Sequence, residues 1–132
     1  MSVKSWVMNL LFGERKENVL LPEPSKPPSV RHLKDASELD GLLGPESRVL
    51  IDFTATWCGP CQKIAPFFAD LSSRFATVEF VKVDVDELNE IAEKFEVKAM
   101  PTFVALRDGK EVARVVGADR AQLEDAAAKL SL

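Results

Sequence analysis

Five short segments of the chain combine apolar and β-branched residues in the manner of β-strands. The run from Arg48 to Thr54 is almost continuously apolar, which is typical of a strand buried on both faces. Two later runs are separated by Arg107-Asp108-Gly109-Lys110, and an Asp-Gly pair in such a position favours a hairpin. The predicted strands cover residues 30–33, 48–54, 78–83, 102–106 and 111–116.

Signals for helices lie between these strands. Asp35, with Glu38 three residues later, has the pattern of a capping box. Pro66 is expected to kink a long helix, because it removes a backbone donor. The predicted helices follow Asp35, run from about Cys58 to Arg74, run from a cap at Asp86 to about Phe95, and follow a cap at Asp119. The resulting order β-α-β-α-β-α-β-β-α predicts an α/β fold, with a mixed sheet flanked by helices on both faces.

The first 29 residues differ from the rest of the chain. Residues 22–28 contain four prolines, which exclude a helix or a central strand and predict a stiff, extended linker. We therefore divide the chain into an N-terminal extension, residues 1–29, and one domain, residues 30–132. Within the extension, apolar residues recur on one face of a short predicted helix, at Val3, Trp6, Val7, Leu10 and Leu11.

A helix as short as residues 1–13 needs a surface against which to bury its apolar face. That surface is the chain's own domain, a partner protein or a membrane. Membrane contact is the weakest of the three interpretations, because Lys4 is the only cation in this stretch. A mitochondrial presequence is disfavoured by Glu14 and Glu17, and no Arg precedes Arg15.

Composition and charge narrow the classes of function. The chain has 132 residues, 46% hydrophobic and 29% charged, which fits one soluble globular domain. A net charge of −4 without a cluster of Lys and Arg argues against nucleic-acid binding. No segment is long enough to span a membrane. We expect a cytoplasmic protein, with mitochondrial or membrane-peripheral placement through the extension as the alternatives.

Cys58 and Cys61 are the only cysteines, and they form one Cys-x-x-Cys. Such a short loop cannot brace a fold, so we expect the pair to be reactive. The start of a helix lowers the pKa of a thiol, which makes Cys58 the expected nucleophile. Cys61 would then attack the mixed disulfide and leave an internal disulfide. Gly59 lets a partner's backbone approach, and Pro60 suits a first helical turn.

The same pair could instead belong to a zinc site. Structural zinc normally takes four ligands, and this chain offers only His32 besides the two cysteines. We therefore expect no metal site.

The stretch from Ile51 to Cys61, Ile-Asp-Phe-Thr-Ala-Thr-Trp-Cys-Gly-Pro-Cys, resembles the active site of the thioredoxin family. The order of predicted elements resembles that family's fold over the whole predicted domain. Thr54 and the phrase Ala99-Met100-Pro101-Thr102-Phe103 resemble the eukaryotic cytosolic type, close to plant h-type thioredoxins. The resemblance implies a thioredoxin fold, here with an extra N-terminal amphipathic helix.

Two charged residues acquire roles from this resemblance. Asp52 lies in the middle of an apolar strand, where burial raises the pKa of a carboxyl group. The resemblance implies that Asp52 assists deprotonation of Cys61 and that Lys82 faces it from the next strand. The alternatives are a hydrogen-bonded structural acid at Asp52 and a solvated strand residue at Lys82.

The resemblance also implies a docking surface for substrates. Met100-Pro101 matches the family's cis-proline turn, whose neighbouring backbone pairs with a substrate strand. The alternative is that Pro101 merely begins a strand. Trp57 is expected to contact partners and not to fill a core. The surface would comprise Trp57, Gly59, Pro60, Met100, Pro101, Val116, Gly117 and Ala118.

Together these features favour a protein disulfide reductase that works as a monomer without a cofactor of its own. The resemblance implies that NADPH supplies electrons through a flavin thioredoxin reductase. It also implies clients such as peroxiredoxins and methionine sulfoxide reductases. One alternative is a thioredoxin-fold binding module that serves a larger assembly through its surface and extension. Another is an oxidase or isomerase, although oxidising relatives usually carry His where this chain has Pro60.

Overall fold

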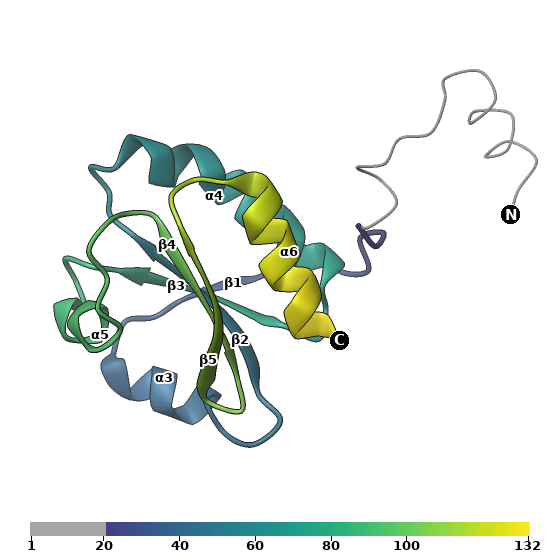
Figure 1. Ribbon diagram of the computed structural model, residues 1–132, viewed down its shortest axis with the longest axis horizontal. Helices are drawn as coiled ribbons and strands as arrows, with labels where there is room; N and C mark the ends of the chain where they lie inside the picture. Colours follow the sequence, from purple (N-terminus) through teal and green to yellow (C-terminus); the bar gives the residue numbers. More distant parts are fainter. Residues whose placement is uncertain (1–20) are drawn as a thin grey trace, which may run out of the picture.

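The computed structural model describes residues 21–132, so the predicted helix within residues 1–13 lies outside the described part of the chain (Figure 1). The elements, in chain order, are β1 (Val30–His32), α3 (Ala36–Leu42), β2 (Arg48–Thr54), α4 (Gly59–Arg74), β3 (Glu79–Asp84), α5 (Asn89–Lys94), β4 (Thr102–Arg107), β5 (Lys110–Val116) and α6 (Arg120–Ser131). This order confirms the predicted α/β fold. None of the helices described is both long and apolar enough to cross a membrane.

The strands form one mixed sheet in the order β1-β3-β2-β4-β5. β3 pairs in parallel with β1 and β2, whereas β4 pairs antiparallel with β2 and β5. The hairpin between β4 and β5 turns at Asp108 and Gly109, whose φ angles are 54° and 78°. Positive φ at both positions is typical of the tight turn that an Asp-Gly pair predicts. A side chain at Gly109 would also meet the carbonyl oxygen of Leu43, at 2.9 Å from its Cβ.

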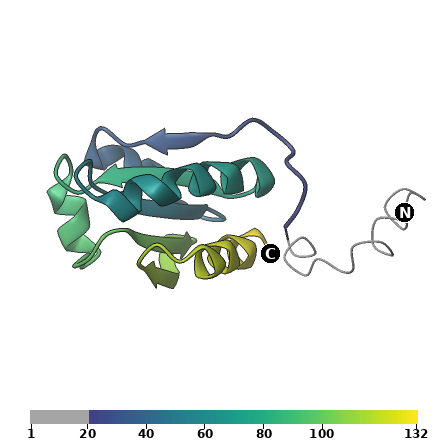
Figure 2. The same cartoon turned by 90° about the horizontal axis from the view of Figure 1, so that it is seen from above.

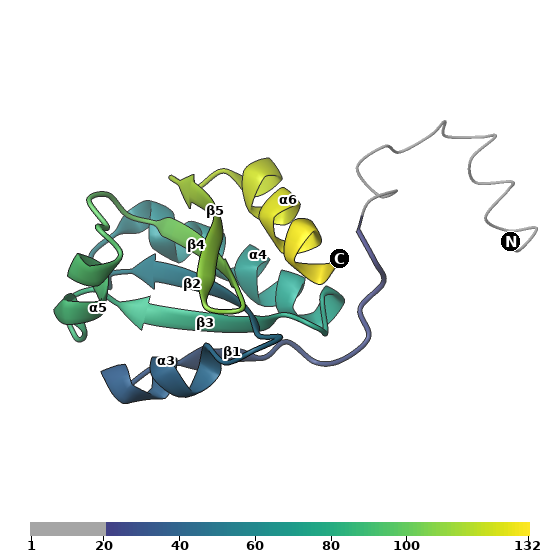
Figure 3. The ribbon, with the colours of Figure 1, turned by 60° about the horizontal axis from the view of Figure 1, so that its bottom comes forward.

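Helices cover both faces of the sheet, as predicted. α4 and α6 lie against one face, and α3 and α5 against the other (Figure 1 and Figure 3). Alternation along β2 divides its side chains between the two faces: Leu50 packs with the α4 and α6 core, and Ile51 packs with the other core. β2 is therefore buried on both faces, which explains its almost continuous apolar sequence.

Most helices begin where their capping residues predict. Asp35 and Glu38 form a complete capping box at the start of α3. Asp119 accepts a hydrogen bond from the backbone N–H of Gln122 at the start of α6. Pro66 lies inside α4, which still continues to Arg74.

The predicted helix cap at Asp86 is wrong. α5 begins at Asn89, after Leu88, whose side chain makes no capping hydrogen bond. The preceding turn is organised by Asp84, whose carboxylate accepts the backbone N–H groups of Asp86, at 2.8 Å, and Glu87, at 3.3 Å. An acid two residues upstream therefore satisfies these donors, and the carboxylate of Asp86 is free to bind elsewhere.

The proline-rich segment of residues 22–28 contains no helix or strand, but it is attached to the domain. The Ser25 N–H donates to the carbonyl of Ser73 at 2.8 Å, and the Ser29 N–H donates to the hydroxyl of Ser72 at 2.8 Å. Arg74 donates to the carbonyl of Pro22 at 3.0 Å. The segment thus runs along the end of α4 and reaches the end of α6 (Figure 2). Below, residues 21–29 are called the strap.

Candidate active site

Cys58 and Cys61 form a disulfide at the start of α4, with their Cα atoms 5.3 Å apart. Cys58 is the N-cap of the helix, and its sulfur accepts the backbone N–H of Cys61 at 3.3 Å. An N–H directed at a sulfur stabilises negative charge on it, as does the start of a helix. Cys58 is 6% exposed and Cys61 is 1% exposed. A reagent at the surface therefore reaches the Cys58 sulfur more readily.

Asp52 lies in the middle of β2, opposite Lys82 of β3 in the parallel register. Their neighbours Ile51 and Val81 belong to the core under α3 and α5, and Leu50 and Phe80, two positions earlier, belong to the α4 and α6 core. Because side chains alternate along a strand, Asp52 and Lys82 both point to the face of the sheet that α4 covers. Asp52 is 1% exposed, and its Oδ1 atom has no hydrogen-bond partner among the described residues. Burial raises the pKa of Asp52 to about 7, and the positive charge of Lys82 lowers that pKa in part.

Lys82 connects this buried acid with the surface. The lysine is half-buried, and it lines a hollow beside the start of α4 together with Thr54, Gln62 and Asp84. Gln62 also donates from its side chain to the carbonyl of Ala55 at 2.9 Å, across the turn that carries the cysteines. A carboxyl group with a pKa of about 7 thus has as its neighbour in β3 a lysine that lines a surface hollow.

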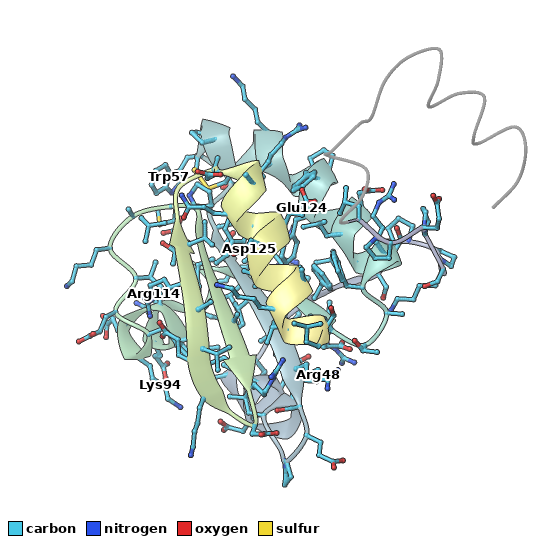
Figure 4. All side chains as sticks on the ribbon, turned by 45° about the vertical axis from the view of Figure 1, so that its right-hand side comes forward. Arg48, Trp57, Lys94, Arg114, Glu124 and Asp125 are labelled. Carbon is cyan, nitrogen blue, oxygen red and sulfur yellow. A yellow bond between two sulfur atoms is a disulfide. The ribbon has the colours of Figure 1, made fainter. Side chains whose placement is uncertain are left out.

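The predicted docking residues include exposed apolar groups, whereas Pro101 is buried. Trp57 is 68% exposed and Val116 is 60% exposed. In Figure 4, Trp57 projects beside the disulfide at the start of α4. The Met100–Pro101 peptide bond is cis, as the resemblance implied, and the carbonyl of Pro101 accepts the N–H of Gly117 at 2.8 Å. The half-buried Met100 packs against the two cysteines.

Sequence reasoning missed the role of Asp86. The indole N–H of Trp57 donates to the carboxylate of Asp86 at 2.9 Å, which ties the exposed ring to the turn after β3. The two residues are 29 positions apart, so no local pattern reveals the contact. The only signal in the sequence was that Asp86 is an acid close to the end of a buried strand, and the same is true of Asp84.

No metal site competes for the cysteines within residues 21–132. No group of three or more His, Cys, Asp or Glu side chains there could hold a metal ion. His32 instead contacts Glu87, with 2.9 Å between its Nε2 atom and a carboxylate oxygen.

Comparison with known proteins agrees with this geometry. Residues 30–129 match the family model described as thioredoxin. This chain belongs to the thioredoxin family. Among curated relatives, Thioredoxin H2-2 of Oryza sativa is 56% identical over 80 residues, which are 61% of this chain and 60% of that protein. Thioredoxin-1 of Saccharomyces cerevisiae is 48% identical over 99 residues, which are 75% of this chain and 96% of the yeast protein.

Solved thioredoxins share the fold as well as the sequence. The thioredoxin of Malassezia sympodialis superimposes with a TM-score of 0.76 at 40% identity, covering 80% of this chain and 93% of that structure. Thioredoxin NaTrxh of Nicotiana alata gives a TM-score of 0.71 at 41% identity, covering 76% of this chain and 91% of that structure. The family and fold predictions are confirmed, and with its Cys58–Cys61 disulfide the chain is a thiol–disulfide oxidoreductase.

Proposed function

We propose that this thioredoxin-family chain reduces protein disulfides in two exchange steps. The Cys58 thiolate attacks one sulfur of a substrate disulfide, and the other substrate sulfur leaves as a thiolate. The Cys61 thiolate then attacks the Cys58 sulfur, and the second substrate sulfur leaves. Two electrons thus pass to the substrate, and the Cys58–Cys61 disulfide forms. The observation that carries this order is the position of Cys58 as the helix cap, with the Cys61 N–H directed at its sulfur.

In this proposal Asp52 accepts the proton of Cys61 before the second step. Its position on the face covered by α4 and its pKa of about 7 support the role, since a general base works best with a pKa near the operating pH. Lys82 holds the acid electrostatically and links it to the open hollow.

The docking surface suits an extended segment of a client protein. Exposed Trp57 and Val116 offer apolar contact, and the backbone beside the cis Met100–Pro101 bond offers hydrogen bonds to a strand. Gly59, Pro60 and Ala118 are also exposed, and Gly117 is half-buried beside them.

We further propose that peroxiredoxins and methionine sulfoxide reductases are clients, and that NADPH supplies electrons through a flavin thioredoxin reductase. One structural neighbour, 40% identical with a TM-score of 0.69, comes from work on thiol resolution in a yeast mitochondrial 1-Cys peroxiredoxin via glutathione/thioredoxin systems. We propose a cytoplasmic monomer as the working form.

The first experiment is dithiothreitol-driven reduction of insulin by the wild type, Cys58→Ser and Cys61→Ser. The wild type is expected to accelerate precipitation, and Cys58→Ser to be inactive. Cys61→Ser is expected to accumulate a mixed disulfide with the substrate. If the wild type does not accelerate the reaction, the reductase proposal fails, and a binding module that acts through its surface becomes the better explanation.

The role of Asp52 is tested by the pH dependence of the second step. Below pH 7 the carboxyl group is protonated and cannot accept a proton, so resolution of the mixed disulfide is expected to slow in the wild type. Asp52→Asn is expected to be about a hundredfold slower at pH 8, which is the low end of general-base effects, and to lack the inflection near pH 7. An unchanged profile in Asp52→Asn would show that the acid is structural.

A further inference from the structure

An apolar groove lies at the end of the domain opposite the disulfide. It lies between the C-terminal ends of α4 and α6, and its apolar lining includes Phe75, Ala128 and Leu132. Leu132 is 84% exposed, and Ala128 is half-buried. The disulfide caps the other end of α4, 16 residues away along the helix, or about 24 Å at the usual rise per residue. The groove therefore has no part in the redox chemistry.

The strap brings the first described residues of the chain to this groove. Arg74 and the backbone of Ser73 hold Pro22 and Ser25 at the end of α4. Leu21, the first described residue, lines the groove and packs against the core that α4 and α6 share. The described part of the chain therefore begins at the groove, and in the sequence the two residues before Leu21 are the apolar Leu20 and Val19.

We propose that residues 1–20 fill the groove, with the apolar stripe of Val3, Trp6, Val7, Leu10 and Leu11 covering Ala128 and Leu132. The stripe is apolar on one face and needs a partner surface, because a helix of this length is marginal alone. The groove is an apolar surface that needs a cover. When the stripe packs into the groove, the apolar surfaces of both are removed from water.

The tether favours this occupant over a separate molecule. Leu11 and Leu21 are ten positions apart, and a chain segment of that length spans at most about 35 Å, so the end of the stripe stays within a domain diameter of the groove. A short flexible tether gives an effective concentration on the order of millimolar. A second copy or another protein must reach that concentration to compete. The extension thus folds back on the pole away from the redox site and leaves that site open.

Fluorescence of Trp6 tests the proposal in the full-length chain. Trp57 is the only other tryptophan, so Trp57→Phe leaves Trp6 as the sole reporter. Ala128→Glu places a charge in the groove, and Ala121→Glu places the same charge on an exposed site of α6 outside it. We expect Trp6 to be quenched by acrylamide about threefold more readily in Ala128→Glu than in Ala121→Glu, as a released indole regains contact with water.

Two controls separate the alternatives. Insulin reduction is also measured for Ala128→Glu in a chain that keeps Trp57. We expect its rate to equal that of the wild type, which would show that the domain remains folded. This assay tests the reductase proposal separately from the position of residues 1–20. Equal quenching of Trp6 in both glutamate variants overturns the proposal. It is also overturned if Trp6 is protected only in a dimer at high protein concentration, or only after phospholipid vesicles are added.

Discussion

At the scale of single residues, Asp52 combines deep burial with an unpaired oxygen. Burial raises its pKa from 3.8 to about 7 in the folded protein. Because the folded protein then binds the proton more tightly than the unfolded chain, this group's contribution to stability is fully present below about pH 4 and is lost as pH rises to about 7. A difference of roughly three pKa units corresponds to about 4 kcal/mol.

Asp52→Asn is therefore expected to increase the free energy of unfolding at pH 8, by an amount on the order of 3 kcal/mol after the cost of burying an amide. The increase should shrink toward zero at pH 4. Urea unfolding at both pH values measures it. Asp40→Asn, at an exposed position of α3, is the matched control and should change stability little at either pH. A stabilisation of equal size at pH 4 and pH 8 would contradict the assigned cause.

The contact between Trp57 and Asp86 gives a second prediction at this scale. Asp86→Ala removes the acceptor of the indole N–H, so the exposed ring becomes free to turn away from the docking surface. A hydrogen bond to a charged group is worth about 1 kcal/mol at such a site, so we expect KM for insulin to rise about fivefold with kcat unchanged. The assay is NADPH-dependent insulin reduction with thioredoxin reductase. Glu87→Ala, which removes the neighbouring contact to His32, should leave KM unaltered.

At the scale of elements, sequence patterns predicted the features that depend on neighbouring residues and missed the contacts between distant parts of the chain. β2 occupies the predicted residues, and α3 begins at its predicted capping box, because apolar runs and capping residues act within a few positions. The start of α5 was mispredicted because the carboxylate of Asp84, in the preceding strand, accepts the backbone N–H of Asp86 in the turn before the helix. The cysteine pair was evident from its spacing. The contacts of Asp86 and of the strap join distant parts of the chain, and no local pattern encodes them.

The hydrogen bonds of the strap lead to a prediction about stability at the scale of elements. Ser25→Pro removes the backbone N–H that donates to Ser73, and the loss of one partly buried hydrogen bond is expected to cost about 1 kcal/mol of stability. Lys26→Pro is the control, since its N–H makes no hydrogen bond within residues 21–132. Thermal unfolding of the two variants compares them. Equal melting temperatures would mean that the strap is only loosely held.

At the scale of the whole molecule, the redox-active cysteines and the strap lie at opposite ends of α4. The disulfide caps one end of α4, and the strap is bound at the other end, beside the end of α6. In Figure 4, Trp57 and Arg48 lie at opposite ends of the domain. Arg48 donates to the carbonyl of Ser131 at 3.2 Å and so holds the end of α6, which lies beside the strap.

This polarity predicts that stability and activity respond differently to truncation. Removing residues 1–29 deletes the hydrogen bonds of Pro22, Ser25 and Ser29 to α4, and we expect it to cost about 2 kcal/mol more than removing residues 1–20. For a domain of this size such a loss lowers the melting temperature by about 6–12 °C. Neither truncation touches the docking surface, so kcat/KM for insulin at 25 °C should stay within about twofold of the wild type, where a change below 0.5 kcal/mol falls. A large loss of kcat/KM after removal of residues 1–20 would mean that the extension reaches the redox site, and the two poles would then be functionally coupled.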